Sequence, residues 1–295
     1  MTDLLVKNCL LSKNKNPQDI LINGGVIKDI ASKITADNIP TIDADFHFVT
    51  PPFVDSHFHM DATLSYGLPR VNKSGTLLEG IKLWGELKPN LTADAIKERA
   101  LKFCKWAIAR GTLAIRSHVD VSGQNLVGVE ALLDVKETMK DFIDIQLVAF
   151  PQDGLLRANC LDNLNTALDM GVDVVGGIPH FERSMEEGHE SIRILCEIAE
   201  KRGLLTDLHC DETDDPMSRH VEKLALETTR LGLQGRVAGS HLTSMHSIDN
   251  YYFTKLISLL VEADLNIIAN PLINITIQGR QDNYPKRRGL TRIPE

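Results

Sequence analysis

The sequence predicts an α/β fold, a (β/α)8 barrel of the TIM type that follows a small N-terminal β module. Beyond residue 51, short apolar strands alternate with amphipathic helices. A polar residue ends each strand about every 30 residues, which is the length of one βα unit. Such a series of units closes naturally into a barrel. An open doubly wound sheet is the structural alternative, but no Gly-x-Gly-x-x-Gly motif follows any strand.

Residues 1–50 are predicted to form the β module, and residues 51–295 the barrel. Alternation of polar and apolar residues predicts strands at 4–11, 19–23, 26–30 and 44–49. The run Asn23-Gly-Gly-Val predicts a hairpin turn between the second and third of these strands. His47 lies on the last of them, and we interpret it as structural.

The barrel region divides into strands and helices by its apolar periodicity. Helices are expected at 92–110, 126–139, 161–170, 191–201, 216–231 and 248–263, the first of them capped by Thr92. Strands are expected at 113–118, 143–150, 172–175, 204–209, 236–241 and 265–270. With the strand that ends at His57 this makes seven, and an eighth would end near or beyond residue 300.

Composition and charge narrow the classes of partner. The net charge is -8 and no Lys/Arg block is present, so nucleic-acid and membrane-surface binding have no electrostatic support. No signal peptide or bilayer-spanning apolar stretch is expected. Five scattered cysteines are typical of a reducing compartment, and we expect a cytoplasmic protein with a small-molecule substrate.

Five histidines are predicted to lie at strand ends, on the one face where a barrel keeps its active site. They are His57, His59, His118, His209 and His241. In the motif His57-Phe-His59 the two-residue side-chain period puts both imidazoles on one side, and Asp61 continues that face. Converging neutral imidazoles suit a divalent metal ion, although a lone H-x-H motif is weak evidence. For His118, a role in orienting a neighbour stays open.

Further polar residues suggest hydrolytic chemistry beside that metal. A metal held by three imidazoles lowers the pKa of its water, and Glu212 follows its strand closely enough to take the proton. Gln152, with a donor and an acceptor, suits recognition of a cyclic amide edge. We interpret His180 and His246 as supporting or loop residues. His189 and His220, on helices, are expected to be solvated.

The motif from His57 to Asp61 resembles the first-strand signature of the amidohydrolase superfamily. Further stretches resemble bacterial cytosine deaminases within it, namely residues 73–81, 117–122, 148–154, 174–182, 207–215, 240–246 and 270–280. The resemblance as a whole runs over nearly all of residues 48–293. The resemblance implies hydrolytic deamination of cytosine to uracil and ammonia, a step of pyrimidine salvage. Isoguanine, creatinine or a triazine amide are alternative substrates, and a homo-oligomer stays open.

The resemblance also assigns roles to individual residues. It implies that His57, His59 and His209 bind one divalent ion, iron or zinc, that Glu212 shuttles the proton and that His241 positions the attacking water. It further implies that Gln152 holds the pyrimidine amide and that a loop at 78–84 closes over the substrate. The run 176–179 offers no lysine to bridge a second metal.

One departure from the family pattern concerns the C-terminal part. The family carries a metal-binding aspartate after the eighth strand, and further strands complete its β-sandwich, of which residues 1–50 would be half. Neither feature occurs in these 295 residues, and His220 and Asp282 lie at the wrong places to replace the aspartate. The alternative hypothesis, of a different functional class, is therefore that the chain is an inactive truncated remnant, or a subunit that needs a partner to complete the barrel.

Overall fold

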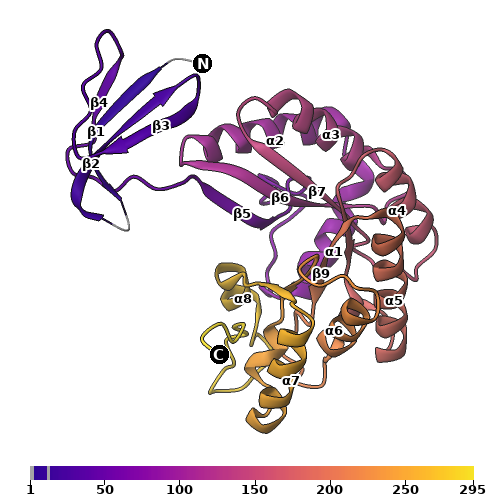
Figure 1. The fold of residues 1–295 in the computed structure, drawn as a ribbon. Coiled ribbons are helices and arrows are strands. Elements are labelled where there is room, and N and C mark those ends of the chain that lie inside the picture. The colour runs from indigo at the N-terminus through magenta and orange to yellow at the C-terminus, as the bar shows by residue number, and fades with distance from the viewer. Residues whose placement is uncertain (1–2, 12–13) are drawn as a thin grey trace. The chain divides into compact units, whose positions relative to one another are not determined.

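A computed structural model describes residues 3–11 and 14–295 and divides the chain into two compact units, Met1–Phe53 and Val54–Glu295. The first unit holds a four-stranded sheet in the order β3-β2-β1-β4 (Figure 1). Its strands are β1 (Leu4–Leu11), β2 (Asn14–Asn23), β3 (Val26–Ala31) and β4 (Thr41–Asp43). β2 pairs antiparallel with both β1 and β3, whereas β4 runs parallel to β1.

The hairpin between β2 and β3 has the predicted two-residue turn. Gly24 and Gly25 adopt φ values of 59° and 80°, and Asn23 pairs with Val26 across the turn. Two consecutive positive φ angles match the twist of the flanking strands, which explains the glycine pair. That this sheet forms half of a composite sandwich stays a prediction.

The strand predicted at 44–49 is wrong. The chain leaves β4 at Asp43, whose Oδ1 accepts the backbone N–H of Asp45 at 2.9 Å. Asp45 and Phe46 then take positive φ values of 45° and 60°, which reverses the chain and ends any strand. Only an isolated bridge between Leu10 and Phe48 follows.

The second unit confirms the predicted (β/α)8-type barrel fold, with seven strands in the order β11-β10-β9-β8-β7-β6-β5. They are β5 (Phe53–Phe58), β6 (Thr112–Asp120), β7 (Asp144–Phe150), β8 (Val174–Gly177), β9 (Leu205–Cys210), β10 (Val237–His241) and β11 (Asn266–Ile268). Parallel pairing joins β6 through β11. Because the strands point the same way, their C-terminal ends form one face of the sheet.

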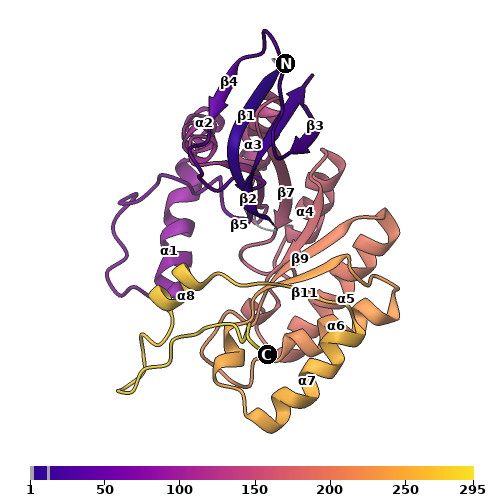
Figure 2. The same ribbon diagram turned by 60° about the vertical axis from the view of Figure 1, so that its left-hand side comes forward.

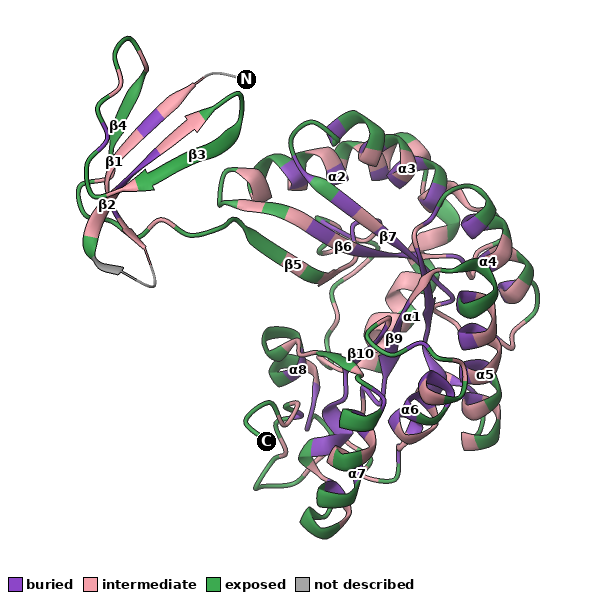
Figure 3. Ribbon diagram, viewed as in Figure 1, coloured by how far each residue is buried: buried purple, intermediate pink, exposed green. Residues whose placement is uncertain are grey.

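Helices lie on the outside of the curved sheet (Figure 1). They are α2 (Ala93–Ile108), α3 (Val127–Met139), α4 (Cys160–Asp169), α5 (Met185–Arg202), α6 (His220–Arg230) and α7 (Asn250–Glu262). Buried residues run along the inner strands β6 to β10 and the sheet-facing sides of these helices (Figure 3), whereas the edge strands β5 and β11 hold none. On α2 the buried residues are Ile96, Ala100 and Cys104. None of the helices in the described residues is both long and apolar enough to cross a membrane.

Helix boundaries follow their capping residues. Thr92 caps α2 as predicted, accepting the backbone N–H of Ala95. α5 begins six residues before its predicted start because Ser184 accepts the N–H of Glu187, and Gly203 ends it at φ 69°. α6 begins four residues after its predicted start, at His220, because residues 215–218 form a turn in which the N–H of Ser218 donates to the carbonyl oxygen of Asp215 at 3.1 Å.

Two α-helices were not predicted. The segment expected as a loop at 78–84 forms helix α1 (Leu77–Leu87), capped by Thr76, and a short 3-10 helix, η1 (Lys88–Asn90), follows it. Helix α8 (Pro271–Ile277) starts with a proline in its first turn. No residue of α1 is fully buried and α8 spans two turns, so neither carries the long apolar stripe from which helices are predicted.

Candidate active site and metal centre

Four histidine side chains turn their Nε2 atoms toward one point at the C-terminal ends of β5, β9 and β10. The Nε2 atoms of His57 and His241 lie 3.1 Å apart, and those of His59 and His209 lie 3.0 Å apart. The rings of His57 and His118 lie 4.3 Å apart, centre to centre. The five histidines predicted at strand ends therefore do come together.

The electrostatics of this cluster favour a bound cation. Burial, followed by the mutual proximity of the imidazoles, holds the pKa values of His57, His59 and His209 well below their usual range. The rings are therefore neutral, and each neutral imidazole offers one nitrogen lone pair to a cation. Ligand atoms lie within 4.8 Å of each other in two groups, one of His57, His209 and His241 and one of His57, His59 and His118. The set predicted from the sequence spans both groups, and its residues could hold a divalent ion.

A supporting chain of hydrogen bonds orients His57. Its Nδ1 lies 3.1 Å from Ser240 Oγ, and this hydroxyl donates to Asp207 Oδ1 at 2.7 Å. Arg116 donates to the other oxygen of Asp207 at 2.9 Å. The hydroxyl proton goes to Asp207, so Ser240 accepts from Nδ1–H of His57, and Nε2 of His57 keeps its lone pair for the centre. The sequence analysis missed both Asp207 and Ser240.

Glu212 lies beside His241 with its carboxyl group buried. Glu212 Oε1 is 3.1 Å from His241 Nδ1 and accepts a hydrogen bond from Asn274 Nδ2 at 3.0 Å. Burial raises the pKa of Glu212 to about 8 and lowers the pKa of His241 to about 3. The contact is therefore between two neutral groups rather than an ion pair. Asn274 comes from α8, the helix that was not predicted.

All six predicted site residues border one cavity of about 800 Å³: His57, His59, Gln152, His209, Glu212 and His241. Helices α1 and α8 lie next to each other (Figure 2). Both border the same cavity, with Trp84 and Ile81 on α1 and Ile273 on α8. Trp84 Nε1 donates to Asp120 Oδ2 at 2.6 Å, which ties α1 to the end of β6. The segment expected to close over a substrate therefore lies at the cavity as a helix.

The remaining polar candidates lie around this cluster. Asp61 is buried, and its carboxylate accepts the backbone N–H groups of Asp120 and Ala62 rather than joining the histidine groups. His180 Nδ1 lies 3.1 Å from the carbonyl oxygen of His209, as expected for a supporting residue. His220, expected in solvent, is 3% exposed. The prediction that His220 is solvated is therefore wrong: His220 is buried because it lies in the first turn of α6, which faces the end of β9.

Comparison with known proteins finds relatives over nearly the whole chain. Residues 40–295 match the model of a family described as the amidohydrolase family. N-isopropylammelide isopropyl amidohydrolase of Pseudomonas sp. (strain ADP) is 31% identical, over 90% of this chain and 67% of that protein. Pterin deaminase of Rhizobium rhizogenes is 29% identical, over 94% of this chain and 64% of that protein.

A solved structure is also similar over nearly the whole chain. 5-Methylcytosine deaminase from Klebsiella pneumoniae, crystallised with 5-fluorocytosine, superposes with a TM-score of 0.95 at 40% identity, covering 98% of this chain and 71% of that one. The chain spans about two thirds of the length of the curated relatives it matches.

Proposed function

Because the chain belongs to the amidohydrolase family, we propose that it takes part in the metal-dependent hydrolytic deamination of cytosine or a close relative such as 5-methylcytosine. In this reaction water replaces the exocyclic amino group, giving the oxo product and ammonia. The observation that carries the proposal is the buried cluster of neutral histidines, which borders one cavity together with Glu212 and Gln152. The similarity to 5-methylcytosine deaminase supports the choice of ring.

The metal site of this proposal consists of His57, His59 and His209. Their neutral rings and the contact between the Nε2 atoms of His59 and His209 fit a soft-to-borderline divalent ion such as zinc or iron. A bound ion there would supply Lewis acidity and lower the pKa of an attacking water.

The other residues then act on protons and on the substrate's orientation. In its carboxylate form, Glu212 takes one proton from the attacking water and returns it to the ring nitrogen or to the departing amine. His241, held 3.1 Å from Glu212, positions that water. Gln152 offers an amide donor and acceptor to the matching edge of the pyrimidine.

The test is ammonia release from a panel of rings by the complete gene product, loaded with zinc or with iron. Cytosine and 5-methylcytosine are the expected substrates, and isoguanine, creatinine, pterin and N-isopropylammelide are the competitors. If the protein turns over a competitor but neither cytosine nor 5-methylcytosine, the proposed substrate is wrong. If it turns over none of the rings, the proposed deaminase activity is wrong.

A matched pair of variants separates catalysis from folding. Glu212→Gln should lower kcat by about 10²- to 10⁴-fold, because it removes the proton carrier at nearly constant shape. Glu200→Gln makes the same chemical change on the exposed face of α5 and should leave kcat unchanged. Equal kcat values for the two variants would remove Glu212 from the mechanism.

A further inference from the structure

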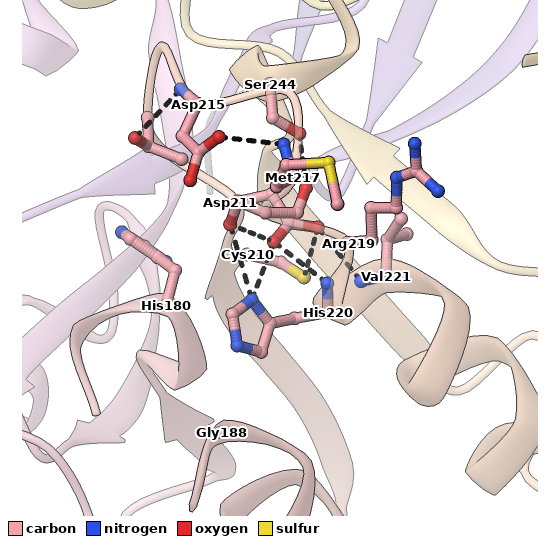
Figure 4. Close-up of polar contacts among 12 residues, drawn as sticks. His180, Gly188, Cys210, Asp211, Asp215, Met217, Arg219, His220, Val221 and Ser244 are labelled. Atoms are coloured by element: carbon pink, nitrogen blue, oxygen red, sulfur yellow. Dashed lines mark hydrogen bonds and ion pairs between the residues drawn. The ribbon is translucent and has the colours of Figure 1, made fainter. Parts of the chain in front are cut away.

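Asp211 lies between the end of β9 and Glu212, and its carboxylate is surrounded by hydrogen-bond donors (Figure 4). Oδ1 accepts from Ser218 Oγ at 2.7 Å and from the backbone N–H of His220 at 3.0 Å. Oδ2 accepts the backbone N–H of Val221 at 2.9 Å. The side chain of Asp211, which is 0% exposed, therefore holds the first turn of α6 against the end of β9.

The main chain of Asp211 makes a second attachment. Its carbonyl oxygen accepts the backbone N–H of Ser244 at 3.1 Å and the hydroxyl of Thr243 at 3.3 Å. Both residues belong to the 3-10 helix η3 (Thr243–His246), which begins two residues after His241. One residue thus links the turn that carries Glu212 to the segment that follows His241.

The ring of His220 is a further donor to Asp211. Its Nδ1 lies 2.9 Å from Asp211 Oδ1, and it is the donor because an ionised carboxylate only accepts. The ring lies over Gly188 of α5 (Figure 4), where an added Cβ would be 2.3 Å from Nε2 and 2.6 Å from the carbonyl oxygen of Pro179. Glycine at 188 therefore leaves room for the imidazole, and the packing fixes its position.

The backbone of Asp211 explains why so many contacts meet there. Its φ of 50° lies in the left-handed region, which is unfavourable for a residue with a Cβ and which aspartate tolerates best when its side chain is hydrogen-bonded. Glu212 is the next residue, so relaxation of this angle would rotate the peptide from which its side chain projects. Displacement of a catalytic group by about 1 Å is enough to cost on the order of 100-fold in rate.

We propose that Asp211, held by His220, is a positioning residue for Glu212, an inference that rests on the function proposed above for Glu212. The carboxylate of Asp211 keeps the left-handed turn in place, and its main-chain carbonyl attaches the same turn to the segment after His241. The two groups that act on the water, Glu212 and His241, are thereby supported by one anchor.

Two variants of His220 test this in the complete gene product, with kcat expressed per folded, metal-loaded chain. His220→Asn keeps an N–H near the position of Nδ1, whereas His220→Leu removes the donor. We expect His220→Leu to lower kcat on the order of 100-fold with KM changed much less, and His220→Asn to restore most of that loss. Asp211→Asn should resemble His220→Leu, because an amide cannot accept at both of its ends.

Thr228→Val is the matched control. Thr228 is buried on the same helix and donates to the carbonyl oxygen of Leu224, so its loss weakens α6 without touching Asp211. If Thr228→Val lowers kcat as much as His220→Leu at an equal fall in Tm, general loosening of α6 explains the effect and the positioning role is overturned.

A structural readout separates this proposal from the proposed function. If the wild-type protein releases no ammonia from any ring, the function fails, and a crystal structure of Asp211→Asn then decides the positioning role. We expect the Glu212 carboxylate to leave its place 3.1 Å from His241 Nδ1. A Glu212 side chain in its original position would overturn the proposal whatever the activity.

Discussion

Replacing Ser240 by alanine should weaken metal binding without removing any proposed metal ligand. Ser240 Oγ stands between His57 Nδ1, at 3.1 Å, and Asp207 Oδ1, at 2.7 Å. Without the hydroxyl, Nδ1–H of His57 loses its acceptor and the buried Asp207 loses a donor. The imidazole is then free to turn or to change tautomer, and Nε2 no longer faces the centre in every molecule.

The size of the effect follows from the two lost hydrogen bonds. A neutral hydrogen bond contributes about 0.5–1.5 kcal/mol and one to a charged group about 1.5–3 kcal/mol. Arg116 still pairs with the other oxygen of Asp207, so part of the second contribution remains. A loss of about 1.4–2.8 kcal/mol in metal binding corresponds to a 10- to 100-fold rise in Kd, the range usual for residues that support a metal ligand.

The assay is competition for zinc with a chromogenic chelator of known affinity. Ser258→Ala makes the same substitution on the exposed face of α7 and should keep the wild-type Kd. If Ser240→Ala also keeps the wild-type Kd, then the hydrogen-bonded chain to Asp207 does not orient His57 and the reasoning is refuted.

Three further predictions concern stability and reactivity. Burial raises the pKa of Glu212 from 4.5 to about 8, so in the metal-free protein its contribution to stability is full below pH 4.5 and is lost as pH rises through about 8. Glu212→Gln should flatten that part of the pH profile in urea unfolding, and an unchanged profile would contradict the raised pKa. Gly177→Ala places a Cβ 2.4 Å from Leu195 Cδ1, so unfolding free energy should fall by about 1–3 kcal/mol; an unaltered urea midpoint would show that α5 adapts without strain. All five cysteines are buried and the pKa of Cys196 is raised to about 12, so a thiol reagent at pH 8 should label none of them until the chain unfolds, and rapid labelling of the native protein would count against the core as described.

The parts of the fold that sequence analysis predicted are those whose signal is local. Thr92 could be recognised as a cap because it directly precedes an apolar stripe of 3.6-residue period. The strand ends were found because parallel strands buried on both faces are nearly continuous apolar runs, which a histidine or glutamine interrupts visibly. The placement of His209 and Gln152 at strand ends follows from this change from apolar to polar residues alone.

The segment that follows β4 illustrates the opposite case. The alternation of 44–49 predicts a strand, but the decisive interaction is made by the side chain of Asp43, which accepts the N–H of Asp45 at a turn where Asp45 and Phe46 are left-handed. A short polar side chain competes with strand pairing for backbone donors, and alternation of hydrophobicity does not register that competition.

The hydrogen bonds that orient the metal-site histidines could not be predicted from local sequence patterns, because they join strands on different sides of the barrel. Ser240 on β10 links His57 on β5 to Asp207 on β9, although 183 residues separate the first two in the chain. Only once the sheet curves do these strand ends face one another. Asp207 nevertheless leaves a trace in the sequence, since it stands two residues before His209 on the same side of the strand. A buried aspartate one strand period before a histidine at a strand end has no packing role of its own. A buried carboxylate needs charged or hydrogen-bonding partners, which Asp207 finds in Arg116 and Ser240, so an aspartate within this apolar strand indicates a residue that supports the neighbouring histidines.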